Sequence, residues 1–231
     1  MADLRPSILI IEDEPEIRRF LRAAFGVEGY RVVESVAGRR GSIDAGTHKP
    51  DLAIVDLGLP DVDGVEVIRR IRAWSSMPII VLSARVQERS KIEALDAGAN
   101  DYVTKPFGIG ELLARVRAAL RHAVRAGSSA AILRFGNAMV DLEKRTATRD
   151  AKEVHLTPIE FRLLTALGKQ LGMVVTHRQL LAEVWGPTHE SDTHYLRIYM
   201  KQLREKLETD PVRPRHFLTE TGIGYRLVAD D

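Results

Sequence analysis

The first half of the chain alternates short apolar runs with longer stretches of helical periodicity. The apolar runs cover residues 7–11, 30–35, 52–56, 77–84 and 101–104, and apolar residues recur at helical spacing over 17–25, 65–72, 92–99 and 111–121. Nearly continuous apolar strands that alternate with amphipathic helices are typical of a parallel sheet covered on both faces. The pattern therefore predicts an α/β fold with a doubly wound sheet of five parallel strands.

Polar residues stand where these strands end. Glu12 and Asp13 follow the first strand, Asp56 ends the third, Ser83 lies at the end of the fourth, and Lys105 follows the fifth. In an open α/β sheet, functional groups collect at the carboxyl ends of the strands. If the first and third strands are neighbours, three carboxylates converge at one edge of the sheet, together with a hydroxyl and an ammonium group.

Three carboxylates that lie close together repel one another unless a cation lies among them. Oxygen ligands without cysteine or clustered histidine favour a hard cation, here Mg²⁺. Ser83 and Lys105 are then suited to contact a transferred phosphoryl group, and Asp56 is suited to attack it. A main-chain carbonyl at Gly58, in the turn that follows, would be a further metal ligand. An acid at a strand end is often only a turn cap, but the set as a whole favours a phosphoryl-transfer site.

The pattern changes after residues 123–131, a stretch of small residues that we interpret as a linker between domains 1–122 and 132–231. In the second domain, short strands are predicted over 132–136, 138–142, 146–149 and 153–156, helices over 158–171, 177–184 and 193–207, and a terminal hairpin over 216–228. Antiparallel strands followed by three helices and a hairpin predict an α+β domain.

The third helix of this domain has an apolar face and a basic face. The basic face carries His194, Arg197, Ile198, Lys201 and Gln202, with Arg204 beside them. Basic side chains on a helix are commonly only solvated, but an exposed aliphatic residue among them is unusual. A helix in the DNA major groove uses Arg or Lys on guanine, Gln on adenine and an aliphatic side chain on the thymine methyl. We therefore predict a DNA-reading helix, with a wing formed by Thr219, Thr221, Gly222 and Tyr225.

A second predicted interface lies in the first domain. Its residues mix charges of both signs with apolar side chains, and they are Lys91, Ile92, Leu95, Asp96, Asp101, Glu111, Ala114, Arg115 and Arg117. The charges allow Lys91–Glu111, Asp96–Arg117 and Asp101–Arg115 pairs between two copies related by a two-fold axis, which requires such self-complementarity. A solvated pair of helices is the simpler explanation for any one of these charges.

The strings LIIEDE, VDLGLPDVDG, LSA and DYVTKPF together resemble the receiver domain of two-component response regulators, a flavodoxin-like fold, over about residues 5–122. The resemblance implies that Asp56 accepts a phosphoryl group from a sensor histidine kinase, with Mg²⁺ held by the acidic residues. It further implies that Tyr102 is an aromatic switch residue that moves with Ser83, and that the Lys105–Pro106 peptide is cis.

The strings LTPIEFRLL and TGIGYR resemble the winged helix-turn-helix domain of the OmpR/PhoB class, over about residues 132–228. Some members carry an Arg where Thr221 stands here, which argues against a minor-groove Arg contact in this chain. The strings DLGLPD, KPFGIGEL, HYLRIYM and RPRHFLTETGIGYR resemble one subfamily, the KdpE-type regulators of a potassium-uptake operon.

The composition excludes several other classes of protein. The 231 residues include no cysteine, which excludes disulfides, cysteine-ligated zinc and thiol catalysis. The sequence lacks both an apolar run long enough for a membrane span and a secretory signal pattern, so a cytoplasmic protein is expected. The net charge of +2 is too small to indicate nucleic-acid binding without the basic helix face.

We therefore predict a transcriptional regulator, not an enzyme, in which phosphorylation of Asp56 promotes receiver dimerisation and binding to direct-repeat promoter DNA. RNA polymerase is a further candidate partner. The alternatives are a constitutive DNA-binding regulator that does not need phosphorylation, and a phospho-aspartate enzyme or protein-interaction module. A haloacid-dehalogenase-type hydrolase is disfavoured. Similarity to that class would require a second Asp two residues after the nucleophile, and this chain has Gly58 at that position.

Overall fold

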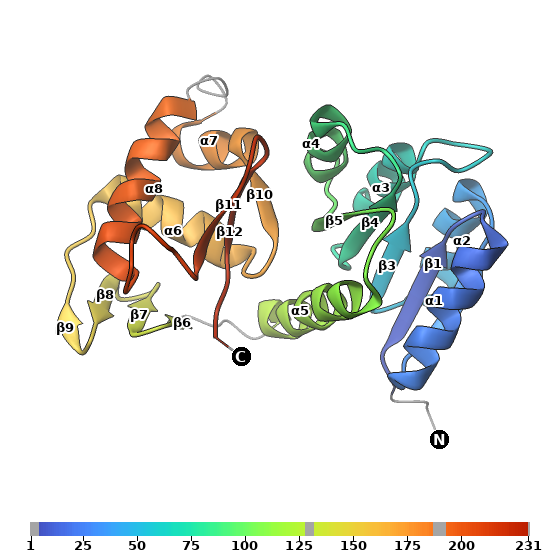
Figure 1. Ribbon diagram of the computed structural model, residues 1–231, viewed down its shortest axis with the longest axis horizontal. Helices are drawn as coiled ribbons and strands as arrows, with labels where there is room; N and C mark the ends of the chain where they lie inside the picture. The colour runs from blue at the N-terminus through green and yellow to red at the C-terminus, as the bar shows by residue number, and fades with distance from the viewer. Residues whose placement is uncertain (1–4, 128–131, 187–192, 231) are drawn as a thin grey trace. The chain divides into compact units, whose positions relative to one another are not determined.

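The computed structural model describes residues 5–127, 132–186 and 193–230, and the chain divides into two compact units, Met1–Ala123 and Val124–Asp231 (Figure 1). The elements from the first strand to the long fifth helix are β1 (Ser7–Ile11), α1 (Pro15–Val27), β2 (Arg31–Ser35), α2 (Gly38–His48), β3 (Leu52–Val55), α3 (Gly64–Arg72), β4 (Ile79–Ser83), α4 (Glu88–Asp96), β5 (Asp101–Thr104) and α5 (Ile109–Gly127).

The first unit is built on one parallel sheet with the strand order β2-β1-β3-β4-β5. Every residue of β1, β3 and β4 is buried, as a sheet covered on both faces requires. Helices α2, α3 and α4 adjoin one another on one face, and α1 and α5 lie on the other (Figure 1). The predicted doubly wound α/β fold with five parallel strands is confirmed.

Helix α2 was not predicted, because its sequence has few large apolar residues. Its glycines let the helix backbone lie close to neighbouring side chains. A Cβ at Gly41 would lie 2.5 Å from Ile11 Cδ1, and one at Gly38 would lie 2.5 Å from Val62 Cγ1. Its first turn is capped from outside the helix, since Asp61 accepts hydrogen bonds from the backbone N–H groups of Gly38 and Arg39 at 2.7 and 3.0 Å.

The turn after β3 begins α3. Asp63 is the N-cap residue and its side chain accepts a hydrogen bond from Val65 N at 2.9 Å, so the helix start predicted at Asp63–Gly64 is confirmed. A Cβ at Gly64 would overlap the carbonyl oxygen of Asp56. Glycine is therefore required where the chain folds back against the end of β3.

Helix α5 is longer than predicted and runs to Gly127. Residues 123–127, which we predicted as the start of the linker, are therefore helical. The rest of the predicted linker, residues 128–131, lies outside the described residues.

The second unit contains a four-stranded antiparallel sheet, three helices and a three-stranded sheet. The elements are β6 (Ile132–Phe135), β7 (Ala138–Asp141), β8 (Thr146–Arg149), β9 (Lys152–Glu153), α6 (Pro158–Lys169), β10 (Val174–Thr176), α7 (His177–Trp185), α8 (Thr193–Leu207), β11 (Phe217–Glu220) and β12 (Gly224–Leu227). Strand β10 was not predicted; it pairs with β12 and joins the terminal hairpin to the helices. The strand predicted over 153–156 is short, because β9 ends at Glu153.

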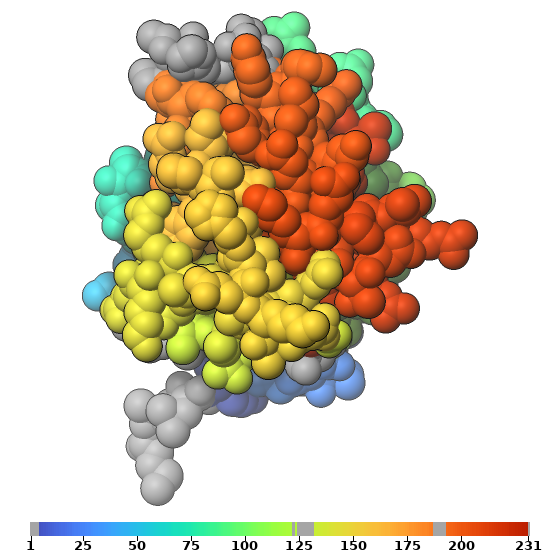
Figure 2. All heavy atoms as spheres, turned by 90° about the vertical axis from the view of Figure 1, so that its left-hand side faces the viewer, coloured from blue at the N-terminus to red at the C-terminus, as the bar shows by residue number. Residues whose placement is uncertain are grey.

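Two helices of this unit begin with capping boxes, at Thr157–Glu160 for α6 and at Thr176–Gln179 for α7. Phe135 and Phe217 meet edge to face in the core, with ring centroids 5.4 Å apart. Helix α8 covers this core with its apolar side and, in the space-filling view, forms a broad part of the exposed face (orange-red in Figure 2). Within the described segments, none of the helices is both long and apolar enough to span a lipid bilayer.

Candidate functional site

Three carboxylates meet at the carboxyl ends of β1 and β3. Carboxylate oxygens of Glu12, Asp13 and Asp56 all lie within 4.8 Å of one another. The two strands are direct neighbours in the sheet, and Asp56 N donates a hydrogen bond to Ile11 O at 2.9 Å, which aligns the two strand ends. Glu12 and Asp56 are 1% and 6% exposed. The sheet order thus brings together the acids that the sequence places 44 residues apart.

Lys105 reaches the same cluster from the end of β5. Its Nζ lies 2.8 Å from Glu12 Oε2, 3.1 Å from Glu14 Oε1 and 3.5 Å from Asp56 Oδ1. The ion pair with Glu12 is buried, since the Glu12 side chain is 1% exposed and that of Lys105 is 11% exposed. The peptide bond between Lys105 and Pro106 is cis, as the resemblance implied.

The electrostatics of the cluster are those of crowded acids around one cation. Burial is the main cause that raises the pKa of Glu12; Asp56 adds to the rise and Lys105 opposes it. Burial alone would lower the pKa of Lys105, but the surrounding carboxylates outweigh it and hold that pKa above its usual value. Two buried acids beside one ammonium leave an excess of negative charge, which is the environment that a divalent cation stabilises.

The turn after β3 orients the side chain of Asp56. Gly58 N donates to Asp56 Oδ2 at 3.0 Å, which leaves Oδ1 facing Lys105. A Cβ at Gly58 would lie only 3.1 Å from Asp56 Oδ2, so the small residue keeps space beside the carboxylate. The Gly58 carbonyl remains a predicted metal ligand.

Ser83 and Tyr102 are linked through Arg85, which the sequence reasoning did not single out. Ser83 is 1% exposed, and its Oγ accepts a hydrogen bond from Arg85 N at 3.2 Å. Tyr102 donates its hydroxyl proton to Arg85 O at 2.6 Å. Burial raises the pKa of Tyr102, against the effects of Ser83 and Arg85.

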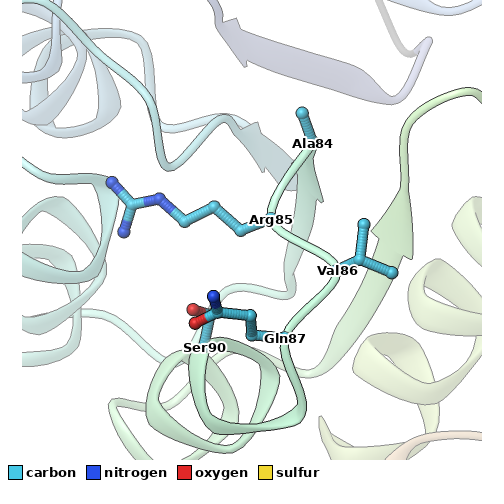
Figure 3. Close-up of a pocket in the computed structure, with 5 residues that line it drawn as sticks. All are labelled: Ala84, Arg85, Val86, Gln87 and Ser90. Atoms are coloured by element: carbon cyan, nitrogen blue, oxygen red, sulfur yellow. The ribbon is translucent and has the colours of Figure 1, made fainter.

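The Arg85 side chain also ties two loops together. It lies 2.8 Å from Asp63 Oδ2 and 3.3 Å from Leu57 O, so it connects the loop after β4 to the turn after β3. Figure 3 shows Arg85 and Val86 pointing to opposite sides of a pocket-lining loop, which also carries Ala84 and Gln87; Ser90, on α4, lines the same pocket. No local pattern distinguishes this arginine from a solvated one in the sequence.

The residues of the predicted dimer face are partly engaged within one chain. Arg115 lies 2.7 Å from Asp101 Oδ2 and 2.7 Å from Glu111 Oε1. The Asp101–Arg115 pair predicted between two copies therefore forms inside the chain, because α5 packs beside the start of β5. Leu95 is 1% exposed in the single chain, so it packs in the receiver core here, and its place on the dimer face remains a prediction.

Other members of that face keep accessible groups. Lys91 Nζ lies 5.7 Å from the centroid of the Tyr102 ring, Ala114 is exposed, and Arg117 lies 3.5 Å from Glu28. Ile92 and Asp96 are partly exposed. The dimer face remains a prediction for these residues.

Helix α8 has the two faces that its sequence predicts. Leu196, Met200, Leu203 and Leu207 are buried. His194, Arg197, Ile198 and Lys201 are exposed, Gln202 is partly exposed, and Ile198 keeps 39% of its surface accessible. Tyr195, 53% exposed, lies beside His194 on this surface and was not predicted.

Arg204 and Tyr225 differ from the other predicted DNA contacts because they join α8 to the hairpin. Arg204 Nε donates to Phe217 O at 3.0 Å, and Arg204 Nη2 donates to Thr219 Oγ1 at 2.7 Å. Tyr225 is 5% exposed, with its ring against His177. These two side chains are therefore internal supports rather than free groups. Thr221 and Gly222 are exposed in the β11–β12 turn.

Comparison with known proteins matches both units. Residues 8–117 match the family model of the response regulator receiver domain, and residues 151–227 match that of the C-terminal transcriptional regulatory protein domain. Over 222 residues the chain is 58% identical to the KDP operon transcriptional regulatory protein KdpE of Escherichia coli K12, across 96% of this chain and 99% of that protein. This chain belongs to the KdpE-type response regulators.

Other relatives agree with this assignment. The chain is 48% identical to the transcriptional regulatory protein KdpE of Mycobacterium tuberculosis, across 96% of this chain and 99% of that protein. It matches the crystal structure of DrrB, an OmpR/PhoB homologue from Thermotoga maritima, with a TM-score of 0.51 and 29% identity, across 98% of this chain and all of that one. The predicted family, the receiver and the DNA-binding domain are confirmed.

KdpE-type response regulators are DNA-binding transcription factors rather than enzymes. Membership therefore makes this chain a transcriptional response regulator, with a sensor histidine kinase and DNA as the partners that its two domains imply. Receiver domains bind Mg²⁺ at an acidic pocket, and the cluster of Glu12, Asp13 and Asp56 is the corresponding feature here.

Proposed function

We propose that Mg²⁺-dependent phosphorylation of Asp56 by a sensor histidine kinase switches this regulator to a dimer that binds promoter DNA of a potassium-transport operon. The observation that carries the proposal is the convergence of Asp56 with two further acids and Lys105 at the strand ends. A structural role alone does not require three carboxylates within 4.8 Å of one another beside one ammonium.

The donor set fits Mg²⁺. It consists only of carboxylate oxygens, from Glu12, Asp13 and Asp56. Glu12, Asp13 and Asp56 would hold the ion, with the Gly58 carbonyl as a further ligand. When bound, the ion supplies positive charge against the oxygens of the phosphoryl group.

The residues of the chain supply the rest of the chemistry. One oxygen of Asp56 forms the new O–P bond as the N–P bond of the donor histidine breaks. Lys105 stabilises negative charge on the phosphoryl oxygens, and Ser83 donates its hydroxyl proton to one of them. The hydrogen bond from Gly58 to Asp56 Oδ2 keeps the other oxygen, Oδ1, available on the side of Lys105.

The switch follows from the connection between Ser83, Arg85 and Tyr102. A phosphoryl group that accepts the Ser83 hydroxyl proton would shift Ser83 Oγ toward the site and so move the acceptor of the hydrogen bond from Arg85 N, while Arg85 O accepts from Tyr102. Tyr102 contacts Lys91 on the predicted dimer face. Phosphate and DNA would then both favour the dimer, so each strengthens the binding of the other.

The first test is phosphorylation itself. The purified protein is incubated with Mg²⁺ and a small-molecule phosphodonor, and its intact mass is recorded beside that of Asp56→Asn. The expected result is the gain of one phosphoryl group that the variant does not show. If neither protein gains mass, the site is not a working acceptor, and the constitutive DNA-binding alternative takes precedence.

The second test concerns dimerisation and DNA. Sedimentation and gel-shift measurements are made with and without the phosphodonor, again beside Asp56→Asn. Phosphorylation is expected to shift the protein to a dimer and to tighten binding to DNA from the promoter of a potassium-transport operon more than to a scrambled sequence. The operon is proposed because the E. coli relative bears the name of the KDP operon.

The proposal also places the protein in the cytoplasm, with RNA polymerase as a further partner at the promoter. Co-purification of polymerase with the DNA-bound, phosphorylated protein would support the second point. Equal recovery with Asp56→Asn would contradict a role for phosphorylation in that contact.

A further inference from the structure

Arg18, near the start of α1, contacts the main chain that carries two residues of the acidic cluster. Its Nη1 donates hydrogen bonds to Glu12 O at 2.7 Å and to Asp13 O at 2.6 Å. Its side chain is only 14% exposed, and its Nε lies 3.9 Å from Glu34 Oε2 on β2. One guanidinium thus holds the main chain of two successive residues whose carboxylates converge with Asp56.

The other contacts of the loop between β1 and α1 are made by Glu12 and Glu14. Glu12 N donates to Ser35 O at 3.1 Å, Lys105 Nζ lies 2.8 Å from Glu12 Oε2 and 3.1 Å from Glu14 Oε1, and Glu14 N donates a weak bond to Glu12 Oε1 at 3.3 Å. Glu14, the N-cap residue of α1, makes no side-chain capping hydrogen bond. Two carbonyls directed at one donor fix the direction of the chain at both residues. The directions in which the Glu12 and Asp13 side chains leave the backbone are fixed with it.

We propose that Arg18 is a positioning residue for the metal site, which sets the Glu12–Asp13 loop in the geometry that binds Mg²⁺. This inference rests on the proposed function, because it concerns the same acidic cluster. Partners that orient metal ligands without touching the metal commonly change metal affinity by about 10- to 100-fold when they are removed.

The charge of Arg18 gives the inference a sharp test. The positively charged guanidinium of Arg18 repels a Mg²⁺ ion in the nearby cluster, so removal of the Arg18 charge alone would make Mg²⁺ bind more tightly. Removal of its hydrogen bonds to the loop would make Mg²⁺ bind more weakly. The two effects have opposite signs, and a measured affinity distinguishes them.

Arg22 is a matched control. It lies one turn further along α1, its Nη1 is 3.4 Å from Glu34 Oε1, and its side chain is 61% exposed. It has the same charge and the same carboxylate partner as Arg18, but none of its described contacts reaches the β1–α1 loop. Arg22→Met therefore reproduces the loss of charge without the loss of the loop contacts.

The experiment measures Mg²⁺ dissociation constants by calorimetry for the full-length wild type, Arg18→Met and Arg22→Met, with melting temperatures recorded in chelator to confirm folding. We expect the Arg18→Met constant to rise about tenfold or more. The Arg22→Met constant should stay within about twofold of wild type, or fall. If Arg18→Met does not fold, Arg18→Lys carries the test, since it keeps the charge and shortens the reach of the donor; its affinity should also fall.

An Arg18 variant that folds and binds Mg²⁺ as tightly as wild type, or more tightly, overturns the inference. Equal weakening in Arg18→Met and Arg22→Met also overturns it, because a general effect of α1 charge would then explain both. Absence of Mg²⁺ binding by the wild type would instead refute the proposed function.

Discussion

Arg72 gives a quantitative test of how the receiver supports its α4–β5 segment. This arginine ends α3, and its guanidinium donates to Gly98 O at 2.8 Å, to Ser75 O at 3.0 Å and to Asn100 Oδ1 at 2.8 Å. All three acceptors are neutral oxygens of main-chain carbonyls or of an amide, rather than carboxylates. Burial lowers the pKa of Arg72 to about 10. We predict that Arg72→Met destabilises the receiver.

The magnitude follows from two opposing effects. Hydrogen bonds from a charged donor contribute about 1.5–3 kcal/mol each, so the loss of three costs about 4.5–9 kcal/mol. The lowering of the Arg72 pKa to about 10 means that burial of the charge costs roughly 3 kcal/mol, which the methionine recovers. The expected net loss in the free energy of unfolding is therefore about 1.5–6 kcal/mol.

Urea unfolding measures this difference. The chain has two tryptophans, Trp74 in the first unit and Trp185 in the second, so a Trp185→Phe background makes the fluorescence report on the receiver alone. Arg70→Met is the matched control: Arg70 also lies near the end of α3, but its side chain is 44% exposed and its pair with Glu66 is worth at most about 1 kcal/mol.

A loss below about 1 kcal/mol in Arg72→Met, or a loss equal to that of Arg70→Met, would refute the reasoning, since the three hydrogen bonds would then do no more than offset the cost of burying the charge. A loss in the expected range would show that the segment carrying Gly98 and Asn100 is held in place by one buried cation.

Three further predictions follow from the structure. Burial alone would raise the pKa of Glu160, but the ion pair with Lys206 at 2.7 Å and the capping box outweigh it, so the pKa is lowered. The ionised Glu160 carboxylate therefore stabilises the fold above the unfolded pKa near 4.5, and this stabilisation is lost as the pH falls through the folded pKa. Glu160→Gln should therefore lower the melting temperature at pH 7 but not in acid, and an equal loss at both pH values would contradict the linkage. Lys105→Met should slow phosphorylation by a small-molecule donor about 100-fold, as measured by intact mass over time, while Mg²⁺ still binds. An unchanged rate would show that Lys105 does not contact the phosphoryl group. Arg204→Ala should lower the melting temperature, because it loses the bonds to β11, whereas Arg197→Ala should leave it unchanged and reduce the salt dependence of DNA binding by about one unit of slope; the reverse pattern would make Arg204 the DNA contact.

The sequence was sufficient for the fold class of both domains, for most of their elements and for the residues of the acidic cluster. Hydrophobic periodicity identifies strands and helices because burial on one or both faces is a local property of each element. Once the strands are parallel, their carboxyl ends share an edge, so Glu12, Asp56 and Lys105 could be placed together without coordinates. The two faces of α8 followed from the same reasoning.

Helix α2 shows where this reasoning fails. Its glycines pack closely against Ile11 and Val62, so its stability comes from what surrounds it rather than from apolar side chains of its own. Strand β10 is likewise defined by its pairing with β12, some fifty residues away along the chain. Periodicity cannot detect an element whose partners are remote in sequence and whose own residues are small or few.

The roles of individual charged residues depended on the tertiary structure as well. Arg18, Arg85 and Arg204 look alike in the sequence, as basic residues on or near helices. Only the fold directs the first to the carbonyls of the β1–α1 loop, the second to Asp63 and the third to the hairpin. The sequence by itself determined most of the elements, because burial is a local property, and it placed the acids at one edge of the sheet, because the carboxyl ends of parallel strands share that edge. The tertiary structure made β1 and β3 neighbours, and this brings the acids together. The tertiary structure decided which cations support the site and the wing, because a long flexible side chain selects its partners only after the backbone has placed the acceptors.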